Sequence, residues 1–152
     1  MKKDDILYIG FWVDPEAIKA LLQGTPFEGY VVKPESHMTV AFRPDKERLS
    51  ELLPHLGQEI TLTMESIGTL HKNGILCNIG LKINADNLGV FMPENTPHIT
   101  VWINTQEKNK AGKLIAKAFE TFKCKWDNPI SADLVGRLAV FNGKNEWDFS
   151  VQ

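Results

Sequence analysis

Apolar and polar residues alternate along several short segments of the chain, and in other segments the apolar residues recur at helical spacing. Such alternation is typical of half-buried strands. β-branched and aromatic residues are also common in strands and support the same assignment. We therefore predict strands over residues 6–13, 29–33, 37–42, 59–70, 75–83, 98–103, 130–141 and 146–151. Apolar residues spaced by three and four predict a helix after Asp14, another after Asp45, and a third over residues 107–122, which has the clearest period.

Capping residues mark the ends of two predicted helices. Asp14 is followed by Pro15, and this pair supplies an N-cap acceptor and the preset φ of a first helical position. The same helix ends at Gly24, a residue type that favours helix termination. Asp45 caps the second helix, and Pro54 leaves the extent of its last turn open.

Asn-Gly dipeptides at residues 73–74 and 142–143 separate pairs of predicted strands. Asn-Gly is strongly preferred in two-residue hairpin turns, because both positions require positive φ. The order of elements is therefore strand, helix and strands, followed by hairpin, strand, helix and hairpin. This order predicts an α+β fold in a single domain that covers residues 1–152.

Composition narrows the class of protein. The chain has 152 residues, a formal net charge of −2 and a pI near 6.1. This charge argues against non-specific electrostatic binding of long nucleic acid, but it is compatible with a local basic pocket. Cys77 and Cys124 fit neither a disulfide scaffold nor a zinc knuckle. No segment reads as a signal peptide or a membrane span. We expect a monomeric, cytoplasmic protein with no membrane partner.

One short phrase occurs twice in the chain. Residues 34–40 read PESHMTV and residues 95–101 read NTPHITV, so that each places a histidine two residues before a threonine in an apolar, β-branched run. A valine and a Pro-Glu pair precede both motifs, and an amphipathic helix is predicted after both. The repetition predicts two pseudo-symmetric lobes of antiparallel sheet with outer helices, whose two His-x-Thr strands face each other across a central cleft.

Strand geometry places the histidine and the threonine of each motif on one face, because alternate side chains of a strand point to the same side. His37 therefore shares a face with Thr39, and His98 shares a face with Thr100. The side chains on the opposite face of each strand are all apolar and are expected to pack in the core. The face with the histidine and the threonine is therefore expected to line a cleft. Two imidazoles can act as general base and general acid near neutral pH, and a hydroxyl beside each can hold a phosphoryl oxygen.

Two other interpretations of the motifs compete with this one. A single His-x-Thr can arise by chance in a chain with four histidines, and a lone histidine in a strand is more often structural. Two matches in the same strand context favour a functional pair over coincidence. A metal site is the third interpretation, but two histidines without carboxylates or cysteines at ligand spacing argue against it.

The motifs at residues 37–40 (HMTV) and 98–101 (HITV) resemble those of the two-histidine (2H) phosphoesterase superfamily. This group includes 2′-5′ RNA ligase-like proteins and cyclic phosphodiesterases, and residues 96–102 (TPHITVW) are most similar to its tRNA-ligase and RNA-repair branch. The resemblance extends over most of the chain in length and in element order. It implies a bilobal α+β fold with a central cleft, catalysis without a metal ion or cofactor, and a phosphodiester substrate, commonly a 2′,3′-cyclic phosphate.

The resemblance also implies roles for individual residues. Carried over onto this chain, it makes His37 and His98 the catalytic pair and makes Thr39 and Thr100 the ligands of the phosphate. His98 takes the role of the base that orients the attacking water, and His37 takes that of the acid that protonates the leaving oxygen. These two roles exchange in the reverse reaction.

Three further residues are candidates for substrate binding. Trp102 shares the face of His98 and can either stack on a base or complete the core at the rim. Arg43 lies one step past the first motif strand, where it can reach a phosphate or lie at a solvated strand end. Tyr8 lies in the first predicted strand. Its side chain either joins the core or lines the cleft, and the alternation of side chains along the strand does not decide between the two.

Three functions fit these observations. The first is hydrolysis of a cyclic phosphate or another phosphodiester on RNA ends or small nucleotides. The second is hydrolysis of cyclic oligonucleotide immune messengers, as in family members of the viral anti-defence type. The third is a nucleotide-binding module without catalysis, which the intact histidines of both motifs disfavour. The expected partner is therefore a small nucleotide or an RNA end.

Overall fold

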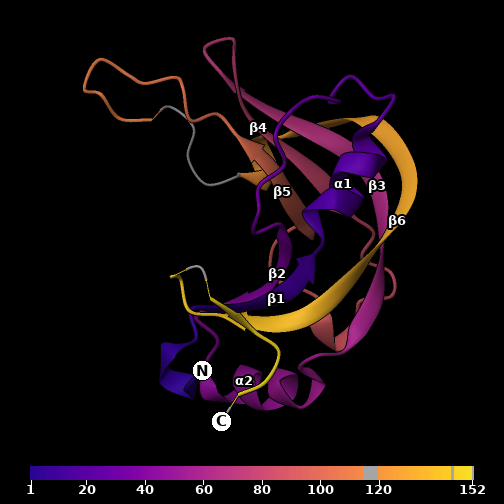
Figure 1. Cartoon of the computed structure of the whole chain (residues 1–152), viewed down its shortest axis with the longest axis vertical. Helices are drawn as coiled ribbons and strands as arrows, with labels where there is room; N and C mark the ends of the chain where they lie inside the picture. The colour runs from indigo at the N-terminus through magenta and orange to yellow at the C-terminus, as the bar shows by residue number, and fades with distance from the viewer. Residues whose placement is uncertain (115–119, 145, 152) are drawn as a thin grey trace.

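Antiparallel sheet makes up most of the structure, a computed structural model in which residues 1–114, 120–144 and 146–151 are described (Figure 1). Seven strands are present in these ranges. They are β1 (Tyr8–Val13), β2 (His37–Phe42), β3 (Glu59–Lys72), β4 (Ile75–Ile83), β5 (His98–Ile103), β6 (Lys125–Phe141) and β7 (Trp147–Asp148). The helices are α1 (Pro15–Leu22) and α2 (Lys46–Leu52), with short 3-10 turns η1 (Lys3–Asp5), η2 (Leu53–His55), η3 (Gly89–Phe91) and η4 (Thr121–Lys123). The α+β class predicted from the sequence is correct.

The sheet closes on itself as a six-stranded barrel. Its order is β1-β2-β5-β4-β3-β6, and β6 pairs back onto β1, while β7 extends the sheet beyond β6. Closure is possible because β6 is long: it pairs with β3 along residues 125–137 and with β1 along residues 136–141. In Figure 1, β3 and β6 curve along most of the height of the molecule, with β4 and β5 above β1 and β2. Closure also removes the unpaired edges that an open sheet would expose.

Local sequence signals explain most of the elements. The Asp14 carboxylate accepts a hydrogen bond from the Glu16 amide at 3.0 Å, and α1 begins at Pro15 as predicted. The Asp45 carboxylate caps α2 through the Arg48 amide at 2.8 Å. The second helix then changes to the 3-10 turn η2, which contains Pro54, because a proline cannot donate the next helical hydrogen bond.

The Asn73-Gly74 hairpin is also as predicted. Both residues adopt positive φ, 51° for Asn73 and 77° for Gly74, and they join β3 to β4 as neighbouring antiparallel strands. This is the left-handed backbone that a two-residue hairpin turn requires.

Two predicted elements are wrong in the described residues. Residues 107–114 are not helical: the Asn109 side chain accepts from the amides of Ala111 and Lys113, and Gly112 has a φ of 77°. An asparagine that bonds its own following backbone competes with helix formation, which explains the turn. Residues 115–119 of the predicted helix lie outside the described residues. The second wrong prediction is the strand over residues 29–33, which form a loop.

The apolar faces of the strands fill the barrel interior. The core includes the wholly buried side chains of Phe11 in β1, Met38 in β2, Ile99 in β5 and Leu138 in β6. α1 packs against this core through Ile18, which is also wholly buried. Within the described ranges, none of the helices is long and apolar enough to cross a membrane.

An alanine at Gly10 is expected to destabilise the barrel. A Cβ atom there would lie 2.6 Å from the Met38 carbonyl oxygen and 3.2 Å from the Thr39 Cα, both backbone atoms of β2. These atoms cannot move without parting β1 from β2. Gly10→Ala should therefore lower the free energy of unfolding by about 1–3 kcal/mol, the usual cost of overpacking, in urea denaturation.

Gly24→Ala is the matched control, because Gly24 has a φ of 79° and no atom within 4 Å of an added Cβ. Its cost is backbone strain alone, roughly 1 kcal/mol. A loss at Gly10 no larger than the loss at Gly24 would contradict the close approach of β1 and β2.

Candidate functional site

The two motif strands are neighbours in the barrel wall. β2 and β5 are antiparallel and pair at Met38 and Ile99. The sequence predicted strands that face each other across a cleft, so this expectation is corrected: the strands lie side by side in one sheet. Extending this antiparallel register by one residue in each direction sets His37 across from Thr100 and Thr39 across from His98. The four side chains therefore form a quartet around the Met38–Ile99 pair.

Burial along both strands confirms the predicted alternation. Met38, Val40, Ile99 and Val101 are at most 3% exposed, whereas the four quartet side chains are half-buried. In this register the two histidines are diagonal neighbours, and such residues on an antiparallel pair are typically roughly 7–8 Å apart, with their Cβ atoms somewhat closer. Two imidazoles at this spacing can contact one phosphate group from two sides.

Both motifs share the same backbone irregularity. Between β1 and β2 the register shifts after Gly10, which lies opposite Thr39 and leaves Val40 as an extra residue. Between β4 and β5 it shifts at Gly80, which lies opposite Thr100 and leaves Val101 as the extra residue. These are β-bulges, which bend a strand and re-aim its side chains. The sequence analysis did not use these glycines, although a glycine inside a strand pattern is a known sign of a bulge.

Backbone carbonyl groups orient both imidazole rings. The Nδ1 atom of His37 lies 2.6 Å from the carbonyl oxygen of Glu35, and that of His98 lies 2.9 Å from the carbonyl oxygen of Thr96. A carbonyl oxygen only accepts, so Nδ1 carries a proton in both rings and donates it. The nitrogen that gains or loses a proton is then Nε2 in each histidine.

Burial shapes the electrostatics of the site. It is the main cause that lowers the pKa of His37 and of His98 below the usual value, because a buried imidazolium loses hydration. The hydrogen bonds to Glu35 and Thr96 oppose this effect, since they favour the charged ring. For His37, the nearby charges of Lys33 and His98 lower the pKa further, and Glu35 raises it.

Aromatic rings enclose His37. The ring of Tyr8 stacks on it with centroids 4.9 Å apart, and the ring of Trp147 lies at 5.2 Å. Burial also raises the pKa of Tyr8, so its hydroxyl stays protonated near neutral pH. Tyr8 was a candidate for substrate binding, and the structure brings it into contact with a motif histidine.

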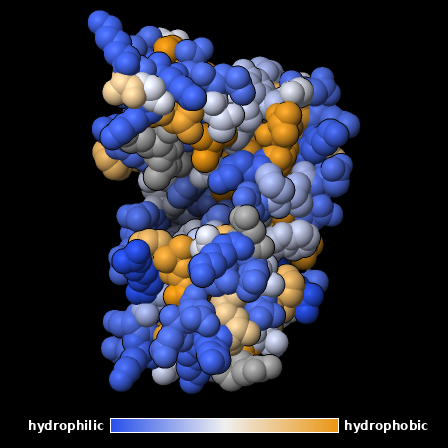
Figure 2. All heavy atoms as spheres, turned by 60° about the vertical axis from the view of Figure 1, so that its left-hand side comes forward, coloured by the Kyte–Doolittle hydropathy of each residue, from blue (hydrophilic) through white to orange (hydrophobic). Residues whose placement is uncertain are grey.

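A cavity of about 660 Å³ adjoins the other histidine. Motif residues Thr39 and His98 line it, together with Arg43 and residues 93–96. The face brought forward in Figure 2 is hollowed at mid-height. Arg43 has a φ of 47°, a left-handed backbone that costs a non-glycine residue roughly 1 kcal/mol or more. Arg43 lines the same cavity as Thr39 and His98, but it is exposed, and its guanidinium lies 5.3 Å from the centroid of the Phe42 ring.

Trp102 is less directly connected to the quartet. It is half-buried on β5 and its ring packs edge-on against Tyr30, with centroids 4.9 Å apart. Its position fits the rim that the sequence analysis considered. His55 lies outside the site, where it contacts Gln58 and Phe91.

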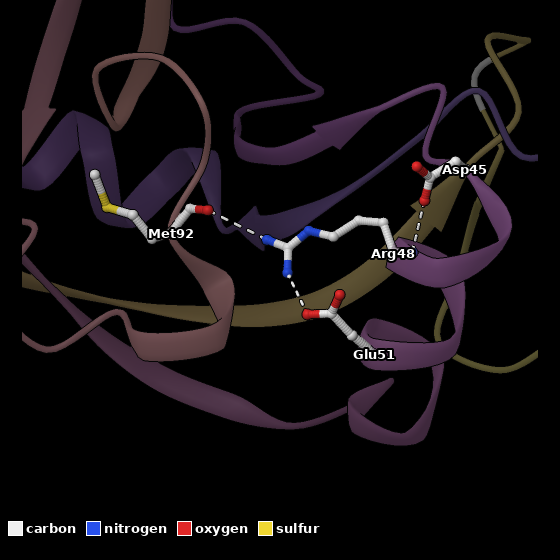
Figure 3. Close-up of polar contacts among 4 residues, drawn as sticks. All are labelled: Asp45, Arg48, Glu51 and Met92. Atoms are coloured by element: carbon white, nitrogen blue, oxygen red, sulfur yellow. Dashed lines mark hydrogen bonds and ion pairs between the residues drawn. The ribbon is translucent and has the colours of Figure 1, made fainter.

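Arg48, which the sequence analysis missed, ties α2 to the segment before His98. Its guanidinium donates to the carbonyl oxygen of Met92 at 3.2 Å and to the carboxylate of Glu51 at 3.3 Å (Figure 3). Arg48 and Glu51 both line the cavity. The contact therefore fixes a cavity wall that leads to Thr96, the residue that orients His98.

In the described part of the chain, no group of three or more histidine, cysteine, aspartate or glutamate side chains is placed to hold a metal ion.

The lowered pKa values of the motif histidines predict how stability depends on pH. Unfolded histidine has a pKa of about 6.5, so the unfolded state binds more protons than the folded state below that pH. The stability that neutral His37 and His98 confer is present above about pH 6.5 and is lost as the pH falls through their folded-state pKa values.

Urea denaturation at about pH 7.5 and about pH 5.5 tests this prediction. The wild type should lose more stability on acidification than the His37→Gln/His98→Gln variant. A His55→Gln/His71→Gln variant should behave as the wild type does. Equal losses in the wild type and the motif variant would refute the lowered pKa values.

No protein-family model matches the chain, and no curated protein matches it. Among solved structures, the chain is similar to the crystal structure of a protein from Thermus thermophilus that is designated TT0787. The two are 19% identical, the match covers 88% of this chain and 86% of that chain, and the TM-score is 0.39. A similarity at this level supports no inference about the activity of the chain.

Proposed function

We propose that the chain is a metal-independent phosphodiesterase of the two-histidine type. Its substrate is a cyclic phosphate or another phosphodiester of an RNA end or a small nucleotide. One observation carries the proposal: the Met38–Ile99 pair brings two histidines and two threonines from distant parts of the sequence onto one face. A structural role would not require both rings to be oriented through Nδ1 by a carbonyl oxygen two residues upstream.

The proposal includes two pseudo-symmetric lobes with a central cleft between them. Three details common to the motifs support it. In each, a glycine of the neighbouring strand lies opposite the threonine, a bulge follows at the valine, and a carbonyl holds Nδ1 of the histidine. Such a match in backbone detail is unexpected for unrelated strands that merely share three residue types.

The reaction requires one neutral and one protonated imidazole. The neutral ring removes a proton from water through Nε2 as the water oxygen attacks phosphorus. The bond from phosphorus to the leaving oxygen breaks, and the protonated ring gives its proton to that oxygen. Thr39 and Thr100 donate hydrogen bonds to the non-bridging oxygens, where negative charge is held as the transition state forms.

The cavity beside His98 supplies room for the rest of the substrate. Arg43 lies on its wall and can pair with a further phosphate, while Trp102 and Tyr8 offer aromatic surface near the opposite end of the quartet. A volume of about 660 Å³ falls within the range of pockets that enclose whole organic ligands. The same volume is compatible with a second candidate function, hydrolysis of a cyclic oligonucleotide messenger.

An assay panel in EDTA tests the proposed function. It includes 2′,3′-cyclic nucleotides, RNA ends with a cyclic phosphate, and cyclic dinucleotides. Turnover of any class should persist in EDTA, and His37→Ala and His98→Ala should each lower kcat by about two to four powers of ten with a modest change in KM. The double variant should lose far less than the product of the two, because the histidines act as a unit.

His55→Ala and His71→Ala are the controls and should retain full activity. Near-wild-type turnover in His37→Ala or His98→Ala would refute the assignment of these two histidines as catalytic residues. Activity abolished by EDTA and restored by zinc or manganese would move the protein to another class of enzyme. Binding of a nucleotide without turnover would support the non-catalytic module instead.

The threonines are tested by removing their hydroxyl groups. Thr39→Val and Thr100→Val keep the β-branched shape, so the strands should persist. Each should weaken transition-state stabilisation by about 1–3 kcal/mol, seen as a lower kcat/KM for the same substrate that the histidines act on. Thr61→Val, at an exposed position of β3, is the control and should have no effect. An unchanged kcat/KM in both Thr39→Val and Thr100→Val would show that the threonine hydroxyl groups do not stabilise the transition state.

A further inference from the structure

The bulge in β2 changes the face on which the last residues of that strand lie. By simple alternation, Phe42 would share the core face of Val40. In the register with β1, however, Ala41 lies opposite the wholly buried Ile9. Phe42 lies opposite Tyr8. Residues directly opposite each other on an antiparallel pair share one face of the sheet, so the extra residue at Val40 turns Phe42 away from the core.

Burial agrees with this register. Phe42 is 62% exposed, whereas Ala41 is half-buried and packs against the core. In β1, Gly10 lies opposite Thr39 and is two residues from Tyr8. Residues two apart on a strand share a face, and each shares it with the residue opposite. Phe42 therefore lies on the same face of the sheet as the quartet.

The ring of Phe42 and the quartet border a common space. Thr39, Phe42 and His98 all line the cavity of about 660 Å³. Three residues of strand separate Thr39 from Phe42, which is a span of at most roughly 10 Å. A nucleotide whose phosphate contacts the quartet covers a distance of this order with its ribose and base. The cavity therefore gives such a base access to the exposed ring.

Contacts on both sides of the strand end hold Phe42 in place. The amide of Arg43 donates to the carbonyl oxygen of Leu7 at 2.7 Å, which fixes the backbone directly after Phe42. The guanidinium of Arg43 lies over the ring, 5.3 Å from its centroid, where a cation is attracted to the aromatic face. A ring that is restricted in this way loses little freedom when a flat ligand stacks on it.

The corresponding position of the second motif differs. Ile103 follows His98 by five residues, as Phe42 follows His37. Ile103 is aliphatic and half-buried, so it offers no flat surface for a base. The two ends of the quartet therefore differ in what they present to a ligand, although the motifs themselves are nearly the same.

We propose that Phe42 is a specificity-determining residue: a nucleobase of the substrate stacks on its ring, in the cavity that it shares with His98. This inference deepens the proposed function and rests on it for the place of the phosphate at the quartet. Stacking on an aromatic ring tolerates every base, because every base has a π-face. The site therefore selects nucleoside phosphates over phosphodiesters without a base, and does not select one base over another.

Equilibrium binding tests this stacking without any need for turnover. The probes are adenosine 3′-monophosphate and cytidine 3′-monophosphate, with inorganic phosphate as the probe without a base. NMR titration follows all three, because it also detects weak binding. The wild type should bind both nucleotides more tightly than inorganic phosphate. Phe42→Ala should weaken both nucleotides by roughly 5- to 150-fold, the usual effect of removing one stacking ring, and leave inorganic phosphate unchanged.

Three further variants separate stacking from packing. Phe42→Tyr keeps the flat ring and should bind the nucleotides as the wild type does. Phe42→Leu keeps apolar bulk without a π-face and should lose most of the affinity that Phe42→Ala loses. Phe122→Ala is the matched control: Phe122 is 80% exposed, and the ammonium of Lys123 lies 5.6 Å from its ring centroid. The described residues that line the cavity do not include Phe122, so this variant should change no affinity.

Stability and kinetics provide readouts that a merely structural ring would not give. Because the side chain is exposed, Phe42→Ala should unfold in urea at nearly the wild-type midpoint. The same variant should raise KM for 2′,3′-cyclic nucleotides. Glycerol 1,2-cyclic phosphate has no base, so Phe42→Ala and the wild type should hydrolyse it with the same kcat/KM.

Three results would overturn the proposal. They are nucleotides that bind the wild type no more tightly than inorganic phosphate does, unchanged nucleotide affinity in Phe42→Ala, or an equal loss of affinity for inorganic phosphate in that variant. Turnover of the assay panel with unchanged nucleotide affinity in Phe42→Ala would overturn the stacking and leave the proposed function in place. Loss of nucleotide affinity in Phe42→Ala without turnover of any substrate would support the stacking and overturn the catalytic function.

Discussion

The pairing of β2 with β5 at Met38 and Ile99 is the constraint on which the rest of the structure depends. It closes the barrel, since β1 and β2 would otherwise be joined to β5, β4 and β3 only through β6. It also sets which side chains face outward. Both paired residues are wholly buried, and a slip of one residue in either strand would move a histidine into the core and an apolar side chain out of it. The energetics of the core therefore hold the quartet together.

Backbone groups orient the quartet once it is assembled. Carbonyl oxygens of Glu35 and Thr96 hold the imidazole rings, and their segments are themselves anchored. The first is held by the buried Ser36, and the second follows the Met92 carbonyl that Arg48 of α2 binds. Side chains supported in this way lose less freedom when a ligand binds, because their rotamers are already restricted.

Two motifs with nearly the same sequence can differ in chemistry because their surroundings differ. The rings of Tyr8 and Trp147 pack against His37, whereas His98 lies at a cavity of about 660 Å³. Desolvation and nearby charges are the terms that separate two otherwise equal imidazoles. A pair that serves as acid and base requires this separation, since two groups with the same affinity for protons would share one proton equally.

The sequence by itself determined what depends on neighbouring residues. The alternation in the two His-x-Thr strands, the caps at Asp14 and Asp45 and the Asn73-Gly74 turn follow from local sterics and hydrogen bonds, and the α+β class follows from their order. The predicted helix over residues 107–122 was wrong at residues 107–114, where a turn centred on Asn109 outweighs the apolar period. Only the tertiary structure decided that β2 and β5 are adjacent, that Tyr8 stacks on His37 and that Lys33 is tied to Val101. Each of these contacts joins residues far apart in the chain, and it forms because closing the barrel buries apolar surface that no local segment can bury alone.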